Sequence, residues 1–235
     1  MLWELLQAAG QGDAALCRRM LDVGGLDINA VSADLNITPL VAAVVGGREP
    51  VVLLMLQRGA EVNKQAGDIR ATALVLAAAQ RDERLCRLLL RAGADPNIDS
   101  EDGNGLAVAA KKDDERITML MLEAGADVQH PSPKGFTPLM SACLAATEQH
   151  GVAQALIDAG AKVNATSPGG CTPLMMAAWA GSRGIVVRLL AAGANPHLRD
   201  EGGATAADWA RRAGNAALAE LLTPPAEGQH EGGQH

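Results

Sequence analysis

The sequence predicts an all-α fold built from repeated pairs of short helices, and three observations carry this prediction. A helix-start signal recurs every 32 to 35 residues along most of the chain. A Gly-Ala dipeptide recurs with nearly the same period, after the second helix of each pair. Apolar residues between these signals follow the spacing of one helical face. Two helices this short bury too little surface to be stable alone, so each pair needs a copy of itself on either side.

The stretch 170–197 shows all of these signals in order. The Thr172 hydroxyl is suited to cap a helix, and Pro173 stands at a first helical position, which needs no N–H donor. Apolar residues at i, i+3 and i+4 follow, and Gly181 ends this first helix. A second apolar stripe predicts a second helix, which ends at Gly193.

The same positions recur along the chain. The helix-start position is occupied by Thr38, Thr72, Asn104, Thr137, Thr172 and Thr205. The glycine after the second helix recurs, each time followed by Ala, at Gly59, Gly93, Gly125, Gly160 and Gly193. The loop that returns to the next pair closes with Asn63, Asn97 and Asn164, and with Gln129 and His197 in the equivalent places.

A period near 33 residues with a Thr-Pro-Leu start and a Gly-Ala-Asp-x-Asn loop resembles the ankyrin repeat. The resemblance implies L-shaped repeats, each with two antiparallel helices and a projecting hairpin, stacked into a curved solenoid. We expect about seven repeats, five interior ones between two caps, in a single domain over residues 1–223. The expected boundaries are about 1–33, 34–67, 68–99, 100–132, 133–165, 166–199 and 200–223.

Individual repeats depart from the common pattern. In the second repeat, Pro50 is placed to open the second helix in its first turn. The fourth repeat has Asn104-Gly105 in place of Thr-Pro, and we expect it to be the least stable, with a glycine inside its first helix. The fifth carries two extra residues around 147–150. Residues 224–235, rich in Pro, Gly and Gln, are expected to form a disordered tail.

The family usually has a histidine after Thr-Pro-Leu, whose ring hydrogen-bonds the hairpin and joins neighbouring repeats. In this chain that position is occupied by Val41, Val75, Ala107, Met140, Met175 and Asp208. We therefore expect apolar packing to replace those hydrogen bonds.

Composition limits the classes of partner. Of the 235 residues 48% are hydrophobic but only 2% aromatic, which suits thin stacked layers better than one large globular core. The net charge of −7 disfavours nucleic acid and favours a basic partner. No apolar run approaches the length of a membrane span, and the N-terminal residues do not form a secretory signal. We expect no nucleic-acid or membrane partner, and a cytoplasmic location.

The cysteines and histidines do not form a catalytic or metal-binding pattern. Cys17, Cys86 and Cys143 occupy core positions and are expected to be small buried hydrophobes, whereas Cys171 lies in a hairpin and is expected to be exposed. No histidine pair has metal-ligand spacing. Acidic clusters in turns, such as Asp113-Asp114-Glu115, lack the spacing of a calcium loop and are expected to be solvated. We expect no enzyme activity, cofactor or metal.

The resemblance implies protein recognition on the concave face, formed by hairpins and first helices. Its exposed positions are expected to be the residue before each helix start and the last turn of each first helix. The candidate protein-binding residues are Ile37, Val45, Gln80, Lys111, Lys112, Phe136, Leu144, Cys171, Trp179 and Arg212. Phe136, Leu144 and Trp179 come from adjacent repeats and would gather apolar bulk, with Trp179 as the anchor. The alternative for Trp179 is a packing role between repeats.

Two functions remain open. The chain could be a binding adaptor or scaffold, monomeric when free, which holds a protein partner without changing it. Alternatively it could be a dedicated inhibitor, such as an immunity-type protein that blocks one cognate, basic toxin or effector enzyme. The convex face, including the Arg84/Arg87/Arg91 stripe, and the extra residues at 147–150 are further places where a partner could bind.

Overall fold

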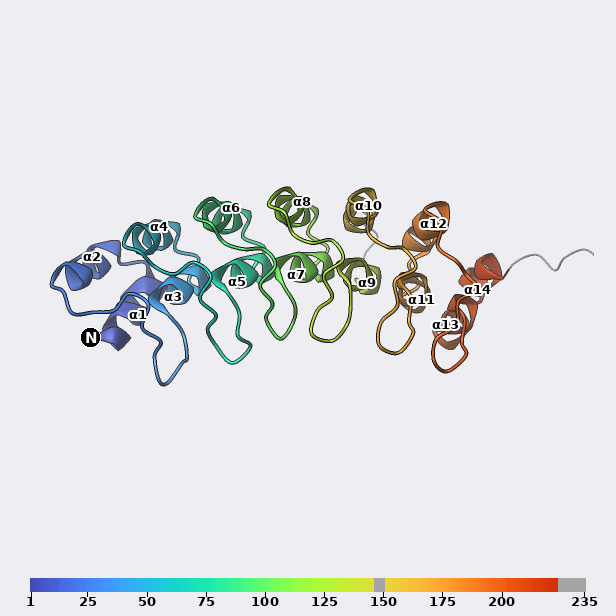
Figure 1. Ribbon diagram of the computed structural model, residues 1–235, viewed down its shortest axis with the longest axis horizontal. Helices are drawn as coiled ribbons and strands as arrows, with labels where there is room; N and C mark the ends of the chain where they lie inside the picture. The colour runs from blue at the N-terminus through green and yellow to red at the C-terminus, as the bar shows by residue number, and fades with distance from the viewer. Residues whose placement is uncertain (146–150, 224–235) are drawn as a thin grey trace, which may run out of the picture. The chain divides into compact units, whose positions relative to one another are not determined.

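The computed structural model describes residues 1–145 and 151–223, and these residues form fourteen helices joined by turns and hairpins (Figure 1). This arrangement confirms the predicted all-α repeat solenoid. The insertion predicted around 147–150 and the tail predicted at 224–235 lie outside the described residues.

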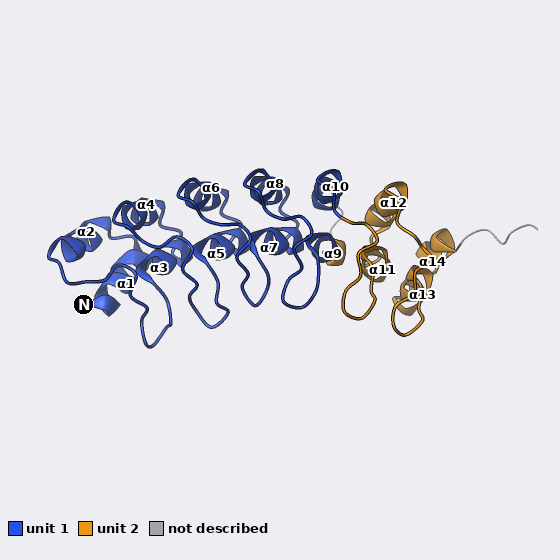
Figure 2. Cartoon of the chain, viewed as in Figure 1, with its two compact units in different colours: residues 1–142, 151–161 blue, residues 143–150, 162–235 orange. Residues whose placement is uncertain are grey.

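The chain divides into two compact units (Figure 2). Unit 1 comprises residues 1–142 and 151–161, and unit 2 comprises residues 143–150 and 162–235. The division falls inside α9 (Pro138–Leu144). A single domain over residues 1–223, and the boundaries of the seven repeats, stay predictions.

Unit 1 is built in two layers of helices (Figure 1). Helices that begin each repeat lie side by side in the first layer, as α1 (Leu2–Gln11), α3 (Pro39–Val45), α5 (Ala73–Ala79) and α7 (Gly105–Lys111). Helices that end each repeat form the second layer, as α2 (Ala14–Asp22), α4 (Glu49–Gln57), α6 (Glu83–Arg91), α8 (Glu115–Glu123) and α10 (Gly151–Asp158). The hairpins project from one edge of the first layer (Figure 1).

Unit 2 repeats this plan over two further helix pairs. Its helices after α9 are α11 (Pro173–Trp179), α12 (Arg183–Ala191), α13 (Ala206–Arg212) and α14 (Ala216–Leu222). Helix α13 packs against both α11 and α14.

The predicted helix starts are confirmed. The Thr172 hydroxyl accepts a hydrogen bond from the Met175 N–H at 3.3 Å, and Thr38 does the same for Val41 at 3.3 Å. Pro50 lies in the first turn of α4, as predicted. These caps satisfy backbone donors that an α-helix leaves unpaired at its N-terminus.

The second helices have caps that the sequence analysis missed. Asp114, expected to be solvated, accepts a hydrogen bond from the Ile117 N–H at 3.1 Å and caps α8. Asp82 caps α6 in the same way, through the Leu85 N–H at 3.0 Å. The prediction that Asp114 is solvated was therefore wrong. Its carboxylate, in place of water, accepts the hydrogen bond from a backbone N–H at the N-terminus of α8.

Apolar packing does occupy the place of the missing histidine. Val41, Val75, Ala107, Met140 and Met175 are each at most 3% exposed. The hydrophobic stabilisation from a fully buried Val or Met side chain is about 1.5–3 kcal/mol.

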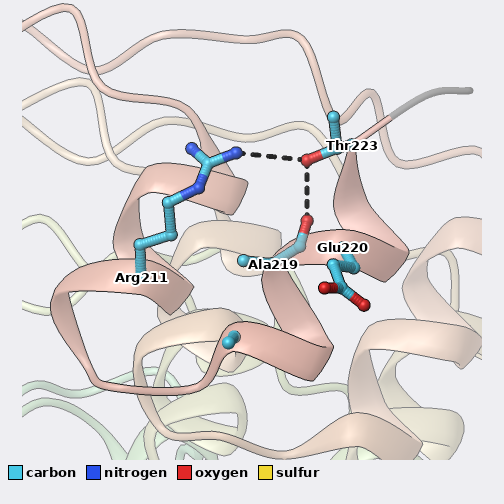
Figure 3. Close-up of a pocket in the computed structure, with 5 residues that line it drawn as sticks. Arg211, Ala219, Glu220 and Thr223 are labelled. Atoms are coloured by element: carbon cyan, nitrogen blue, oxygen red, sulfur yellow. Dashed lines mark hydrogen bonds between the residues drawn. The ribbon is translucent and has the colours of Figure 1, made fainter. Parts of the chain in front are cut away.

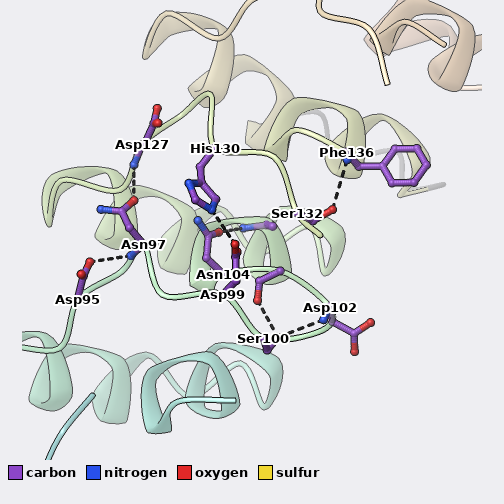
Figure 4. Close-up of polar contacts among 12 residues, drawn as sticks. Asp95, Asn97, Asp99, Ser100, Asp102, Asn104, Asp127, His130, Ser132 and Phe136 are labelled. Atoms are coloured by element: carbon purple, nitrogen blue, oxygen red, sulfur yellow. Dashed lines mark hydrogen bonds and ion pairs between the residues drawn. The ribbon is translucent and has the colours of Figure 1, made fainter. Parts of the chain in front are cut away.

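Polar contacts also join the repeats, and they come from the return loops. The Asn63 amide donates to the Gly93 carbonyl at 3.2 Å, and the Asn63 Oδ1 accepts from the Asp95 N–H at 2.8 Å. The same pair of bonds is made by Asn29, Asn97 and Asn164, each to the following repeat. Figure 4 shows the bond between Asn97 and Asp127.

The first two repeats approach each other closely at Gly46 and Gly10. A Cβ built on Gly46 would lie 2.2 Å from the Gly10 carbonyl oxygen, which belongs to the backbone of α1. A Cβ on Gly10, in contrast, would meet nothing closer than the Ala42 carbonyl oxygen at 3.7 Å, an ordinary contact. Gly46 is therefore required by the packing of α3 on α1, and Gly10 is not.

The fourth repeat departs from the pattern differently than expected. Gly105 is the first residue of α7 rather than an interior one, so the cost of a glycine inside a helix does not apply to it. A Cβ at this position would lie 3.0 Å from the Met121 sulfur. Asn104 caps the helix, because its Oδ1 accepts from the Ala107 N–H at 2.9 Å. That this repeat is the least stable stays a prediction.

We predict opposite effects for two Gly→Ala substitutions. Gly46→Ala should lower the free energy of unfolding by about 1–3 kcal/mol, because its methyl group overlaps the backbone of α1. Gly10→Ala should raise it by about 0.5–1 kcal/mol, since alanine favours the helix and the site has room. Urea unfolding of both variants measures the two changes, and equal signs would contradict the close approach.

The cap of α7 gives a second prediction. Asn104 is 0% exposed, and its Nδ2 has no hydrogen-bond partner among the described residues. Asn104→Thr keeps the capping oxygen and removes the unpaired donor, so the free energy of unfolding should rise by about 1 kcal/mol. Asn104→Ala also removes the unpaired donor but loses the capping oxygen, so its free energy of unfolding should rise by less than that of Asn104→Thr. A destabilised Thr variant would mean that Nδ2 is hydrogen-bonded in solution.

Candidate functional site

Side chains at the last turn of the first helices are exposed in unit 1, as predicted. Val45 at the end of α3 is 55% exposed, and Lys111 at the end of α7 is also exposed. Both lie seven residues after the helix start, off the stripe that packs in the core. These two side chains are therefore exposed as expected, and their role in binding a protein stays a prediction.

Gln80 and Lys112, also exposed as predicted, take part in contacts between repeats. The Gln80 amide donates to the Val45 carbonyl at 3.1 Å, and the Arg81 guanidinium donates to the Lys112 carbonyl. Arg81 also pairs with Asp114 at 3.4 Å. These donors satisfy carbonyls at the C-terminal ends of first helices in neighbouring repeats. The Gln80 amide is thus hydrogen-bonded within the protein, and this bond helps to hold the backbone at Val45.

The residue before the helix start is less exposed than predicted. Ile37, Phe136 and Cys171 are only partly exposed. The reason is that this residue closes the base of the hairpin: the Ser167 N–H, for example, donates to the Cys171 carbonyl at 3.0 Å. Figure 4 shows the Phe136 ring pointing away from the neighbouring polar network.

An aromatic pair forms the most distinctive surface feature of unit 2. Trp179 at the end of α11 and Trp209 in α13 meet edge to face, with ring centroids 5.7 Å apart and planes at 79°. This is a favourable arrangement for two aromatic quadrupoles. Trp179 remains 49% exposed, so it combines a packing contact with a large solvent-facing surface.

Trp209 is in turn held by the hairpin that precedes α13. Its indole N–H donates to Asp200 Oδ2 at 2.9 Å, and Asp200 Oδ1 accepts from the Ala204 N–H at 2.8 Å. The bond from Ala204, followed by that from Trp209, lowers the pKa of Asp200. The exposed ring of Trp179 therefore rests on a partner that is itself fixed by a charge-assisted hydrogen bond.

Leu144 and Arg212, the other predicted residues in unit 2, are both exposed, Leu144 by 45%. Phe136 belongs to unit 1, whereas Leu144 and Trp179 belong to unit 2. The gathering of these three side chains on one surface therefore stays a prediction.

Asp208 organises the start of α13. Its carboxylate accepts from the Thr205 N–H at 2.9 Å and from the Thr205 hydroxyl at 2.8 Å, and Arg211 pairs with it at 2.7 Å. The bonds from Thr205 lower the pKa of Asp208, and the Arg211 charge adds to this effect. Asp208 thus takes the position of the family histidine as a helix cap.

A pocket lined by α13 and α14 lies nearby (Figure 3). Its polar groups bind one another: the Arg211 guanidinium donates to the Thr223 hydroxyl at 3.3 Å, and that hydroxyl donates to the Ala219 carbonyl at 2.8 Å. Since Arg211 also pairs with Asp208, these contacts join the ends of the two helices, and they do not resemble a ligand site.

A histidine–carboxylate pair links two hairpins of unit 1. His130 Nε2 lies 2.8 Å from Asp99 Oδ2 (Figure 4). The Gln65 amide donates to the Asp99 carbonyl at 2.5 Å. Asp99 is therefore part of a contact between repeats. Within the described residues, no group of three or more His, Cys, Asp or Glu side chains is arranged to hold a metal ion.

Three cysteines are core residues, as predicted. Cys17, Cys86 and Cys143 are 0% exposed, and burial raises the pKa of Cys17 to about 11 and that of Cys86 to about 12. Thiols with raised pKa values are poor nucleophiles at neutral pH. Cys171, expected to be exposed, is only partly so.

The lowered pKa values predict how stability depends on pH. Asp200 and Asp208 should stabilise unit 2 above their unfolded pKa of about 3.9, and this contribution should be lost as the pH falls through their lower folded values. Asp200→Asn/Asp208→Asn should therefore melt below wild type at about pH 7, and this deficit should shrink as the pH falls below about 3.9. Glu201→Gln is the matched control. A deficit that persists at low pH would contradict this origin.

Comparisons with known proteins agree with this geometry. A family model that comprises three ankyrin repeats matches four overlapping ranges of the chain, residues 5–100, 74–167, 106–200 and 144–230. A search of curated protein sequences found no match. None of the helices in the described part of the chain has the length and hydrophobicity needed to cross a bilayer. The family match extends over most of the sequence and agrees with the capped helix pairs and the return-loop bonds, and the chain therefore belongs to the ankyrin repeat family.

Proposed function

We propose that this chain is a non-enzymatic module that binds a protein partner on the face formed by its hairpins and first helices, with Trp179 as an anchor. Ankyrin repeats are generally protein–protein interaction modules. The observation that carries the proposal is the half-exposed Trp179 ring held against Trp209. Tryptophan is enriched among residues that dominate interface energetics, and a ring already fixed in the free protein loses little entropy on binding.

Exposed charges fit the rim of such an interface. Lys111 and Lys112 in unit 1 and Arg212 in unit 2 are exposed at or near the ends of first helices. Charges at a rim mainly change the association rate and its dependence on salt. Val45 and Leu144 would contribute apolar contacts of the same kind as Trp179, each in its own unit.

The proposed setting is a reducing compartment such as the cytoplasm, with the free chain as a monomer. All four cysteines are free thiols, which fits an environment where disulfides do not form.

A dedicated inhibitor of a basic enzyme is the second candidate function. The observation that favours it is the negative charge, −7 overall, with acidic residues outnumbering basic ones in unit 1. An acidic surface accelerates encounter with a basic partner. An inhibitor should abolish the partner's activity when bound, whereas an adaptor should leave it intact, and an activity assay of the complex decides between them.

We predict that Trp179→Ala weakens partner binding without unfolding the protein. The partner would be captured from the native host, identified by mass spectrometry and titrated in purified form. Loss of an anchor of about 2 kcal/mol should raise the Kd by roughly thirtyfold. Val187→Ala is the matched control, because Val187 is 48% exposed on α12, a second helix of the same unit.

Thermal melting separates the alternatives for Trp179. If Trp179→Ala lowers the melting temperature sharply, and partner binding falls only in proportion to the loss of folded protein, the ring has a packing role. If binding is unchanged, the partner uses another face and Trp179 is not the anchor.

A further inference from the structure

The hairpin tips of the second, third and fourth repeats form a surface of unit 1 that we call the tip row, consisting of residues 34–36, 68–70 and 101–102. Leu35 is 48% exposed and Ile69 is 39% exposed, and each follows an exposed aspartate. The two tips carry the same pattern 34 residues apart, Asp followed by an apolar residue. Neither apolar side chain belongs to the last turn of a first helix.

Backbone hydrogen bonds hold the tips next to one another. The Gly67 N–H donates to the Asn36 carbonyl at 2.6 Å, and the Glu101 N–H donates to the Ile69 carbonyl at 3.0 Å. Asn36 and Arg70 both have positive φ, at 52° and 50°. The tips at 34–36 and 68–70 therefore share one unusual turn conformation. The tip row is thus preorganised, and a partner would not have to order it on binding.

The tip row carries four carboxylates and one cation, and three of the four carboxylates make no ion pair with another described residue. Asp34, Asp68 and Glu101 are exposed, and none of them makes an ion pair with another described residue. Asp102 pairs with Lys134 at 3.6 Å on the surface, where such a pair adds little stability. The one cation within the tips, Arg70, donates to the Gln65 side chain at 3.1 Å.

We propose that the tip row binds a protein segment whose apolar side chains are flanked by lysine or arginine. The apolar side chains would contact Leu35 and Ile69, and the cations would pair with the carboxylates of Asp34, Asp68 and Glu101. Charge complementarity identifies the partner. Four carboxylates against the single cation Arg70 give the tip row a net negative charge, which repels nucleic acid and anionic lipid surfaces and attracts basic segments. This inference rests on the proposed protein-binding function and names the chemistry of the partner.

A random dodecapeptide library displayed on phage tests the inference on the full chain. Peptides selected on the wild-type protein should combine apolar residues with flanking Lys or Arg. A selected peptide, synthesised and titrated, should bind at least tenfold more weakly to Asp34→Asn/Asp68→Asn/Glu101→Gln and to Leu35→Ser/Ile69→Ser. The loss in the first variant should shrink at high salt, because exposed charges are screened there.

Matched controls come from the second layer of unit 1. Glu49→Gln/Glu123→Gln neutralises exposed carboxylates of α4 and α8, and Leu53→Ser removes a side chain that is 43% exposed. These variants should bind the selected peptide like wild type, and all variants should keep the wild-type melting temperature within a few degrees.

Three results would overturn the inference: selected peptides that lack basic residues, peptides that bind the tip-row variants as well as wild type, or no selected peptide at all. If peptides lose affinity for Trp179→Ala but not for the tip-row variants, the inference fails while the proposed function stands. Loss in the tip-row variants with no change in Trp179→Ala supports the inference, and the anchor role of Trp179 is then decided by the titration of the captured partner.

Discussion

The bridge that an asparagine side chain makes to the next repeat is the contact on which the stack depends. A return loop has no helix of its own, so its backbone groups need partners from elsewhere. The Asn63 amide supplies both at once, donating to the Gly93 carbonyl and accepting from the Asp95 N–H. Because Asn29 and Asn97 repeat this geometry, successive helix pairs of unit 1 keep one register and bury their apolar faces against each other.

Once the register is fixed, the turns and hairpins are free to differ between repeats. Gln80 and Arg81 lie at the turn between two helices, and their side chains donate hydrogen bonds to carbonyls at helix ends in neighbouring repeats. Asp200, in a hairpin, accepts a hydrogen bond from the Trp209 indole, and the Trp209 ring in turn packs against the exposed Trp179. The helices thus provide a constant frame, and the surface properties of each repeat come from short segments that the core does not constrain.

Most of the frame could be predicted from the sequence, because each signal acts locally. Thr172 caps its helix through a bond to a residue three positions away, and periodicity alone places Leu174 in the core. The contacts that were missed or misplaced include the bonds of Gln80 and Arg81 between repeats, the caps by Asp82 and Asp114, and the closing of hairpins. The closing of hairpins by Cys171 and Ile37 depends on backbone pairing that the residue type does not show. The tip row had a signal, the repeated Asp-apolar pair, but it lies outside the positions that the family pattern identifies as exposed.

The nearest-neighbour character of the asparagine bridges has a mechanical consequence. Each joint in unit 1 is held by its own few hydrogen bonds and its own apolar contact, so one joint can open while the bonds of the others stay intact. Pulled along the stack, such a protein should yield one repeat at a time, each releasing about 110 Å of extended chain. The intact repeats would keep their surfaces while their neighbours unravel. A stack joined in this way can act as an extensible tether as well as a binding surface.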